Sequence, residues 1–167
     1  MTSSIYTIRV ATTQDIPLIR SLCFEVWPQT YASIISQAQI DFMLEKMYSP
    51  LSLQQQMKDG AIFLLLINDQ RPVGFASYQP ITATGYKLHK LYVLGSEQGK
   101  GGGKALISYI KATIQQQGAQ YLELQVNRHN NAVNFYKHLG FHIRETADFD
   151  IGHGYFMNDY IMQIDLV

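Results

Sequence analysis

The stretch from Leu88 to Ala105 reads LHKLYVLGSEQGKGGGKA and contains an apolar strand, a polar turn, a glycine-rich loop and the start of a helix. A helix that begins directly after such a loop offers an anion the free N–H groups of its first turn and the positive end of its dipole. Glycines let the anion approach the backbone, because no Cβ stands in the way. The stretch therefore predicts a site for a ligand that carries phosphate.

The spacing of the glycines excludes two common nucleotide motifs. A P-loop needs a glycine five positions before Gly103, where this chain has Gln98, and Ala105 stands where a serine or threonine would bind magnesium. The dinucleotide motif Gly-x-Gly-x-x-Gly finds no third glycine from either possible start. The pattern that is present is Gln-x-x-Gly-x-Gly, formed by Gln98, Gly101 and Gly103. For the loop taken alone, a glycine-rich surface turn is the alternative.

The composition is that of one globular domain, which we expect over residues 1–167. The chain has 167 residues, and 47% of them are hydrophobic, which is enough for a sizeable core. Its 13 basic and 13 acidic residues balance, so we expect no nucleic acid and no anionic membrane as partner. No apolar run is long enough to cross a bilayer, and the first ten residues lack a signal-peptide pattern. A single cysteine, Cys23, suits a reducing compartment, so we expect a cytoplasmic protein.

Alternating and helical patterns predict a mixed order of strands and helices. We expect strands at Ile5–Val10, Ala61–Ile67, Val73–Gln79, Tyr86–Leu94, Tyr121–Val126, Phe141–Phe149 and Tyr155–Asp165. We expect a first helix that is capped by Thr12 or Thr13, has Asp15 in its first turn and ends near Trp27-Pro28. We expect further helices at Ile34–Tyr48, Gly103–Gln117 and Asn131–His138, and a short one at Leu51–Asp59.

The glycine pattern and a second motif resemble the Gcn5-related N-acetyltransferase (GNAT) family. Residues Asn127–Phe141 read NRHNNAVNFYKHLGF, and the family carries a similar Asn…Ala…Phe-Tyr…Leu-Gly-Phe stretch after its pyrophosphate loop. The resemblance extends from Ile5 to Asp165 and is nearest to the bacterial spermidine/spermine-type acetyltransferases. It implies a single-domain α/β (α+β) GNAT fold with a mixed central sheet of about seven strands and four or so helices. It also implies acetyl-coenzyme A (acetyl-CoA) as the cosubstrate.

The resemblance further implies which residues bind the coenzyme. The pyrophosphate would lie on Gln98, Gly99, Lys100, Gly101, Gly102, Gly103 and Lys104, and the pantetheine arm would run along the backbone of Leu91, Tyr92 and Val93. One N–H group of that strand would polarise the thioester carbonyl. Asn130 and Asn131 would reach the arm, and capping of the next helix is the alternative role for each.

Tyr136 and His89 are the catalytic candidates. In the family, a tyrosine at the position of Tyr136 points at the coenzyme's sulfur, so its phenol would protonate the departing thiolate, with core packing as the alternative. An attacking amine with a pKa near ~10.4 is mostly ammonium at pH 7 and must first lose a proton. The imidazole of His89 has a pKa near ~6.5 that suits this general base, and a simply packed or solvated histidine is the alternative. The other histidines show no spacing of metal ligands, so we expect no metal.

The resemblance places the acceptor near the first two helices and the final hairpin. Trp27 and Tyr31 are the substrate candidates, since an aromatic ring attracts an alkylammonium group, and core packing is their alternative role. Acidic residues on these helices are further candidates: Glu25, Asp41 and Glu45.

We therefore expect an N-acetyltransferase that acts by direct attack through a tetrahedral intermediate. Its acceptor would be the primary amine of a small molecule, such as a polyamine or an amino-acid derivative, or else a peptide or protein amine. A non-catalytic acyl-CoA-binding module is the alternative function. The strand at Tyr155–Asp165 would support a homodimer through pairing of edge strands.

Overall fold

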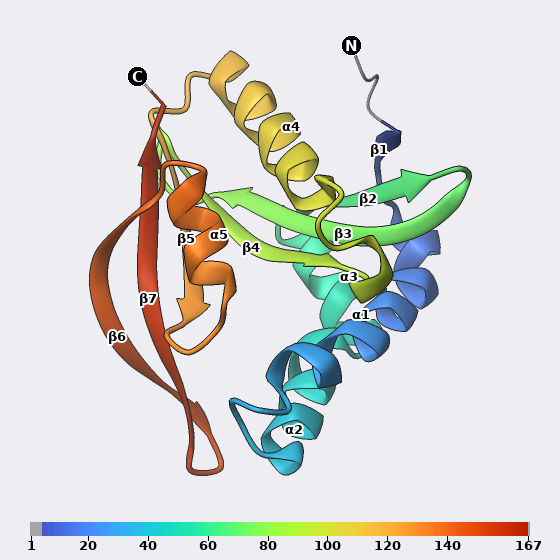
Figure 1. The fold of residues 1–167 in the computed structure, drawn as a ribbon, viewed down its shortest axis with the longest axis vertical. Coiled ribbons are helices and arrows are strands. Elements are labelled where there is room, and N and C mark those ends of the chain that lie inside the picture. The colour runs from blue at the N-terminus through green and yellow to red at the C-terminus, as the bar shows by residue number, and fades with distance from the viewer. Residues whose placement is uncertain (1–4, 167) are drawn as a thin grey trace.

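Seven strands form one sheet in the order β1-β2-β3-β4-β5-β7-β6 in the computed structural model, which describes residues 5–166 (Figure 1). Neighbouring strands are antiparallel, except that β4 and β5 are parallel. The strands are β1 (Tyr6–Val10), β2 (Ile62–Asn68), β3 (Arg71–Pro80), β4 (Gly85–Val93), β5 (Tyr121–Asn127), β6 (His142–Gly152) and β7 (Tyr155–Asp165). The predicted α/β class and mixed seven-stranded sheet are confirmed.

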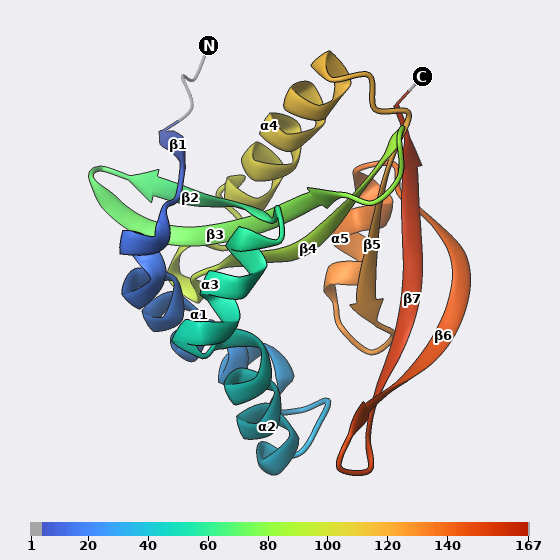
Figure 2. The ribbon, with the colours of Figure 1, turned by 180° about the vertical axis from the view of Figure 1, so that it is seen from behind.

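Within residues 5–166, five α-helices cover the two faces of the sheet (Figure 2), and the short third one is the further helix expected at Leu51–Asp59. The helices are α1 (Ile16–Tyr31), α2 (Gln37–Tyr48), α3 (Pro50–Lys58), α4 (Gly102–Gln116) and α5 (Ala132–His138). The helices pack in two core clusters, one on each face of the sheet. Helices α1, α2 and α3 pack with Phe63 and Phe75 on one face, and α4 and α5 pack with Leu64 and Leu124 on the other. None of the helices described is both long enough and apolar enough to span a membrane.

Helix α1 ends later than the sequence predicts, because Pro28 does not stop it. The expected end lies near Trp27-Pro28, but the helix continues to Tyr31. A proline in a helix interior removes one hydrogen bond and crowds the preceding turn, which costs about 3 kcal/mol. Here Trp27 and Tyr31 are both buried, with ring centroids 4.5 Å apart, and the burial of two large aromatic side chains offsets that cost.

Side-chain caps fix the start of α2 and the start of the short 3-10 helix at Thr13–Asp15 that precedes α1. Helix α2 begins at Gln37, later than expected, because the Ser36 hydroxyl accepts a hydrogen bond from the Gln39 N–H at 3.1 Å. Thr12 and Asp15 form a capping box on the 3-10 helix, whereas α1 itself has no side-chain cap. Both caps use residue types that favour helix starts.

Strands β4 and β5 are paired over only part of their length. Their parallel pairing ends at Leu88 and Leu124, whereas β4 continues beside β3 to Val93. The register of β3 with β4 shifts at the same place and leaves His89 as an extra residue, which is a β-bulge. A bulge bends the strand that carries it. Beyond Leu88, β4 therefore keeps β3 on one side while β5 diverges from it on the other (Figure 1).

Gly74 lets β3 lie close to this last part of β4. A Cβ on Gly74 would lie 2.7 Å from the Tyr92 carbonyl oxygen and 3.3 Å from the Val93 Cα. Both are backbone atoms, so β4 would have to shift. We predict that Gly74→Ala lowers the free energy of unfolding by about 1–3 kcal/mol, measured by urea denaturation.

Ser77→Ala is the control for Gly74→Ala on the same strand. The Ser77 hydroxyl is buried and has no hydrogen-bond partner in the described part of the chain, so its removal should be nearly neutral. Equal losses of stability in the two variants would contradict the backbone contact as the cause.

Candidate functional site

Two cavities meet where β4 and β5 separate. The larger, about 880 Å³, extends between α1, the glycine loop and α5, and the smaller, about 220 Å³, lies between α1, β4, β5 and β7. The residues that line both are Leu91, Tyr92, Asn130, Ala132 and Tyr136. A long ligand in the larger cavity can therefore meet a small molecule in the other one at this junction.

The glycine loop forms one end of the larger cavity. Helix α4 begins directly after Gly101, whose φ of 86° lies in the left-handed region that favours glycine. The Ala105 N–H donates to the Gly101 carbonyl at 2.9 Å, so the N–H groups of Gly102, Gly103 and Lys104 precede the first bond of the helix. These amides and the positive end of the helix dipole make an anion site.

Glu97 attaches the glycine loop to the sheet. Its side chain is buried, with the residue 4% exposed. Its carboxylate accepts hydrogen bonds from the Tyr6 hydroxyl at 3.1 Å and from Asn68 Nδ2 at 3.3 Å, and lies 3.6 Å from Arg71 Nη2. The sequence alone shows this residue only as part of a polar turn, because its partners lie far away along the chain.

The residues predicted for the coenzyme lie together along the larger cavity. Its lining includes Gln98, Gly99, Gly101, Gly102, Gly103 and Lys104 of the loop, Leu91, Tyr92 and Val93 of β4, and Asn130 and Asn131 before α5. Lys100 is exposed and lies outside that lining. Asn130 also fulfils the alternative capping role, since its Oδ1 accepts from the Ala132 N–H at 2.9 Å. The side chain of Asn131 makes no such bond to α5.

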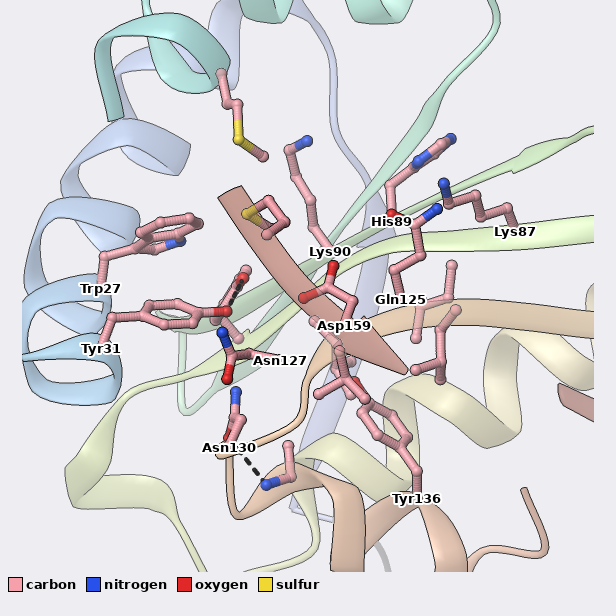
Figure 3. A pocket seen from close by; sticks show the side chains of 18 residues that line it. Trp27, Tyr31, Lys87, His89, Lys90, Gln125, Asn127, Asn130, Tyr136 and Asp159 are labelled. Carbon is pink, nitrogen blue, oxygen red and sulfur yellow. Dashed lines mark hydrogen bonds between the residues drawn. The ribbon is translucent and has the colours of Figure 1, made fainter. Parts of the chain in front are cut away.

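Tyr136 extends from α5 into the junction of the two cavities (Figure 3). It is 6% exposed, and its ring packs against Phe135 and Phe141 at centroid distances of 5.2 Å and 5.5 Å. Burial raises the pKa of its hydroxyl, so this group keeps its proton at neutral pH. Packing and chemistry are compatible here, because a buried phenol can donate a proton to a group in the junction.

Trp27 and Tyr31 form the α1 wall of the smaller cavity (Figure 3). The Tyr31 hydroxyl shares a hydrogen bond of 3.0 Å with the Tyr92 hydroxyl, which joins α1 to β4. Core packing accounts for the burial of both residues, and their contact with an acceptor stays a prediction. The acidic candidates do not line the cavity but lie exposed on the outer faces of their helices: Glu25, Asp41 and Glu45.

His89 lies on the wall of the smaller cavity but is exposed. Its Nε2 lies 3.1 Å from Gln79 Oε1. Desolvation of the ring, with Lys87 and Lys90 nearby, lowers the pKa of His89 to about 4. The imidazole is therefore neutral at pH 7 but takes up a proton only weakly. Its role as a general base stays a prediction.

Asp159 on β7 is a candidate that the motifs do not reveal. It is 1% exposed, and neither carboxylate oxygen has a hydrogen-bond partner in the described residues. Burial raises its pKa to about 6. One signal in the sequence is available: in the alternation of β7, Asp159 shares a face with Met157 and Ile161, so an acid occupies an inward position. A buried, unpaired carboxylate in a cavity is typical of a functional site.

In the part of the chain that the structure describes, histidine, cysteine and acidic side chains do not cluster into a metal site. No group of three of them that could hold a metal ion occurs within residues 5–166. Cys23 is buried in the core cluster of α1, α2 and α3. Burial raises the pKa of its thiol to about 12, so it stays protonated at neutral pH.

Comparison with known proteins identifies the family. Residues 31–151 match the family model described as an acetyltransferase (GNAT) domain. The chain belongs to the GNAT family of acetyltransferases. An uncharacterized N-acetyltransferase of Mycobacterium bovis is 37% identical over 101 residues, which cover 60% of this chain and 64% of that relative. A spermidine N(1)-acetyltransferase of Thermoplasma acidophilum is 27% identical over 149 residues, covering 86% of this chain and 92% of that one.

Solved structures share the GNAT fold. The PaiA N-acetyltransferase of Thermoplasma acidophilum, solved in complex with coenzyme A, has a TM-score of 0.81 at 24% identity and covers 99% of both chains. A GCN5-related N-acetyltransferase of Rhodopseudomonas palustris has a TM-score of 0.84 at 20% identity, again over 99% of both chains. The predicted GNAT fold is therefore confirmed.

The buried carboxylate of Glu97 generates a stability prediction. Glu97→Ala removes the acceptor for Asn68 and the anchor of the glycine loop, so we expect the free energy of unfolding to fall by about 1–3 kcal/mol. Urea denaturation measures the loss. Glu145→Ala is the control, because Glu145 is exposed and has only a 3.8 Å ion pair with Arg144, worth about 0–1 kcal/mol. A loss for Glu97→Ala no larger than for Glu145→Ala would contradict the anchor.

Proposed function

We propose that the chain transfers an acetyl group from acetyl-CoA to the primary amine of a small molecule. The observation that carries this proposal is the junction of the two cavities, where Tyr136 stands between a long cleft with an anion site and a small pocket. Membership of the GNAT family supports acetyl transfer. The amine as acceptor is supported by the relative named as a spermidine N(1)-acetyltransferase, and the coenzyme by the neighbour solved with coenzyme A.

The coenzyme would bind mainly to backbone groups. Its pyrophosphate would accept hydrogen bonds from the N–H groups at the start of α4, and Lys104 would add positive charge beside them. Its pantetheine arm carries two amides, which would pair with the edge of β4 at Leu91–Val93, where β5 has diverged. This pairing is strand addition by a small molecule. The thioester would then lie at the junction of the two cavities.

The reaction requires an amine that has lost a proton and a sulfur that gains one. The amine nitrogen forms a bond to the thioester carbon, and a β4 N–H group stabilises the oxyanion. The C–S bond then breaks with its electron pair on sulfur, and the Tyr136 hydroxyl donates the proton that yields the thiol. The remaining surplus proton on nitrogen passes to the Tyr136 oxygen, so the tyrosine is restored. His89 is the sequence-based candidate for the first deprotonation, and its lowered pKa makes it a weak one.

The size of the acceptor pocket supports a small molecule. Its volume of about 220 Å³ is below the roughly 300–1,000 Å³ of common ligand pockets. A polyamine or an amino-acid derivative is therefore favoured over a peptide or protein amine. Action in the cytoplasm and a homodimer stay predictions. The expected pairing of copies through Tyr155–Asp165 is wrong, because β7 lies between β5 and β6 and is not an edge strand.

Gly101→Ala tests the anion site. A Cβ on Gly101 would meet no described atom within 4 Å, so it would project into the space in front of the loop. We expect the Kd for coenzyme A to rise about tenfold, measured by isothermal titration calorimetry. Gly118→Ala is the matched control at the other end of α4, because Gly118 has the same φ of 86° and also no neighbour within 4 Å. Equal Kd values for the two variants would contradict the anion site.

Tyr136→Phe tests the general acid. We expect kcat to fall about 100-fold while the Kd for coenzyme A is unchanged, because only the proton donor is lost. Release of free thiol in the presence of acetyl-CoA and amines measures kcat. Tyr109→Phe, an exposed tyrosine on α4, is the matched control and should keep full activity. An unchanged kcat for Tyr136→Phe would contradict its role, and coenzyme binding without thiol release from any amine would favour a non-catalytic acyl-CoA-binding module.

A further inference from the structure

The smaller cavity carries charges of both signs that form no ion pair among the described residues. Among the described residues that line it, Asp159 is the only acid, and Lys87 and Lys90 are the lysines. Within residues 5–166, no ion pair involves any of these three. Charges that are buried without a partner destabilise a fold, so a ligand is expected to supply the partners.

Asp159 forms the negative part of the cavity. Its side chain points into the cavity, which Tyr136 also lines (Figure 3). The charged and titratable groups that face it are Lys87 on β4, Arg128 after β5, Asp148 on β6 and Tyr31 on α1. Arg128 and Asp148 form an ion pair with each other, so their charges largely cancel. Lys87 faces the carboxylate but forms no ion pair with it in the described residues, so a cation that enters the cavity can bind there.

Lys90 forms the positive part of the smaller cavity, on the side of α2 and β2. It is 7% exposed, and its Nζ lies 5.1 Å from the ring centroid of Tyr48 and 5.8 Å from that of Phe63. Burial lowers its pKa to about 8, so it is still mostly charged at pH 7. Aromatic rings replace only part of the hydration of an ammonium group. Trp27 lines the same cavity, and its Nε1 is a buried donor that makes no hydrogen bond in the described residues.

We propose that the acceptor is a small primary amine that also carries a carboxylate, with its ammonium bound and deprotonated by Asp159 and its carboxylate bound by Lys90 and Trp27 Nε1. This inference rests on the proposed acetyl transfer. One ammonium proton passes to the Asp159 carboxylate, the freed nitrogen attacks the thioester, and Asp159 then releases that proton to solvent. A polyamine has several cations and no anion, so it would place positive charge beside Lys87 and Lys90.

Matched pairs of amines test the acceptor class. Glycine is compared with ethylamine, and 4-aminobutanoate with butylamine, so that each pair differs by a carboxylate in place of a methyl group; spermidine is the polycationic probe. Thiol release from acetyl-CoA at pH 7.5 gives kcat/KM for each amine. We expect at least one carboxylate amine to exceed its partner about tenfold, since a charge-assisted hydrogen bond is gained, and to exceed spermidine.

Two variants test whether Lys90 binds the carboxylate of the acceptor and whether Asp159 binds its ammonium group. Lys90→Met should lower kcat/KM for the carboxylate amine more than for the alkylamine of the same pair, and so abolish the preference for the carboxylate. Asp159→Asn should lower kcat/KM for every amine about 100-fold. In the unmodified protein, kcat/KM should fall as the pH drops through about 6, where Asp159 takes up a proton, and Asp159→Asn should lose this limb of the pH profile. The exposed residues Lys58 and Asp165 provide the controls Lys58→Met and Asp165→Asn.

The Tm of Asp159→Asn distinguishes a functional role of Asp159 from a structural one. Because an unpaired buried carboxylate destabilises the fold, Asp159→Asn should keep or raise the Tm, whereas loss of a structural residue would lower it. If ethylamine, butylamine or spermidine is the preferred acceptor, or if Lys90→Met leaves the preference unchanged, the acceptor class is overturned while acetyl transfer stands. If no amine releases thiol, the proposed function fails and this inference fails with it.

Discussion

The parallel pairing of β4 with β5 ends at Leu88, and the site depends on this early end. If the two strands were paired as far as Val93, the hydrogen-bonding groups of β4 would be used within the sheet and no edge would be free for a ligand. The bulge at His89 bends β4 at the point of divergence, and Gly74 lets β3 follow it on the other side. The two cavities meet along the same segment, so one irregularity of the sheet creates both the ligand edge and the junction.

Buried polar groups fall into two kinds in this molecule. Glu97 is buried but satisfied, because Tyr6, Asn68 and Arg71 surround its carboxylate, so its contribution is to the position of the glycine loop. Asp159 and Lys90 are buried without ion-pair partners among the described residues, and both lie in the small cavity. Uncompensated groups lower stability, and proteins keep them where a ligand or a reaction uses them.

The sequence predicts the features that local patterns encode. The strand, glycine loop and helix of residues 88–105 carry local turn signals, and alternating patterns mark the seven strands, so these elements are predictable. Tyr136 lies in a motif, so its place at the junction of the two cavities is predictable as well. The end of α1 depends on packing of Trp27 and Tyr31, which outweighs the helix-breaking tendency of proline. The bulge at His89 depends on the register with β3, which no local pattern reveals. The acidic residue on the acceptor side is also not predicted from the sequence. The candidates on α1 and α2 are exposed, and the buried acid, Asp159, lies on β7 outside any motif.

A crystal structure with coenzyme A bound tests the central claim most directly, namely that the divergence of β4 from β5 creates the acetyl-transfer site. The prediction is a pyrophosphate on the N–H groups of Gly102–Lys104, a pantetheine arm paired with the edge of β4 at Leu91–Val93, and a sulfur within about 3.5 Å of the Tyr136 hydroxyl. A coenzyme bound away from this edge, or a sulfur out of reach of Tyr136 with β5 paired to β4 beyond Leu88, would contradict the account.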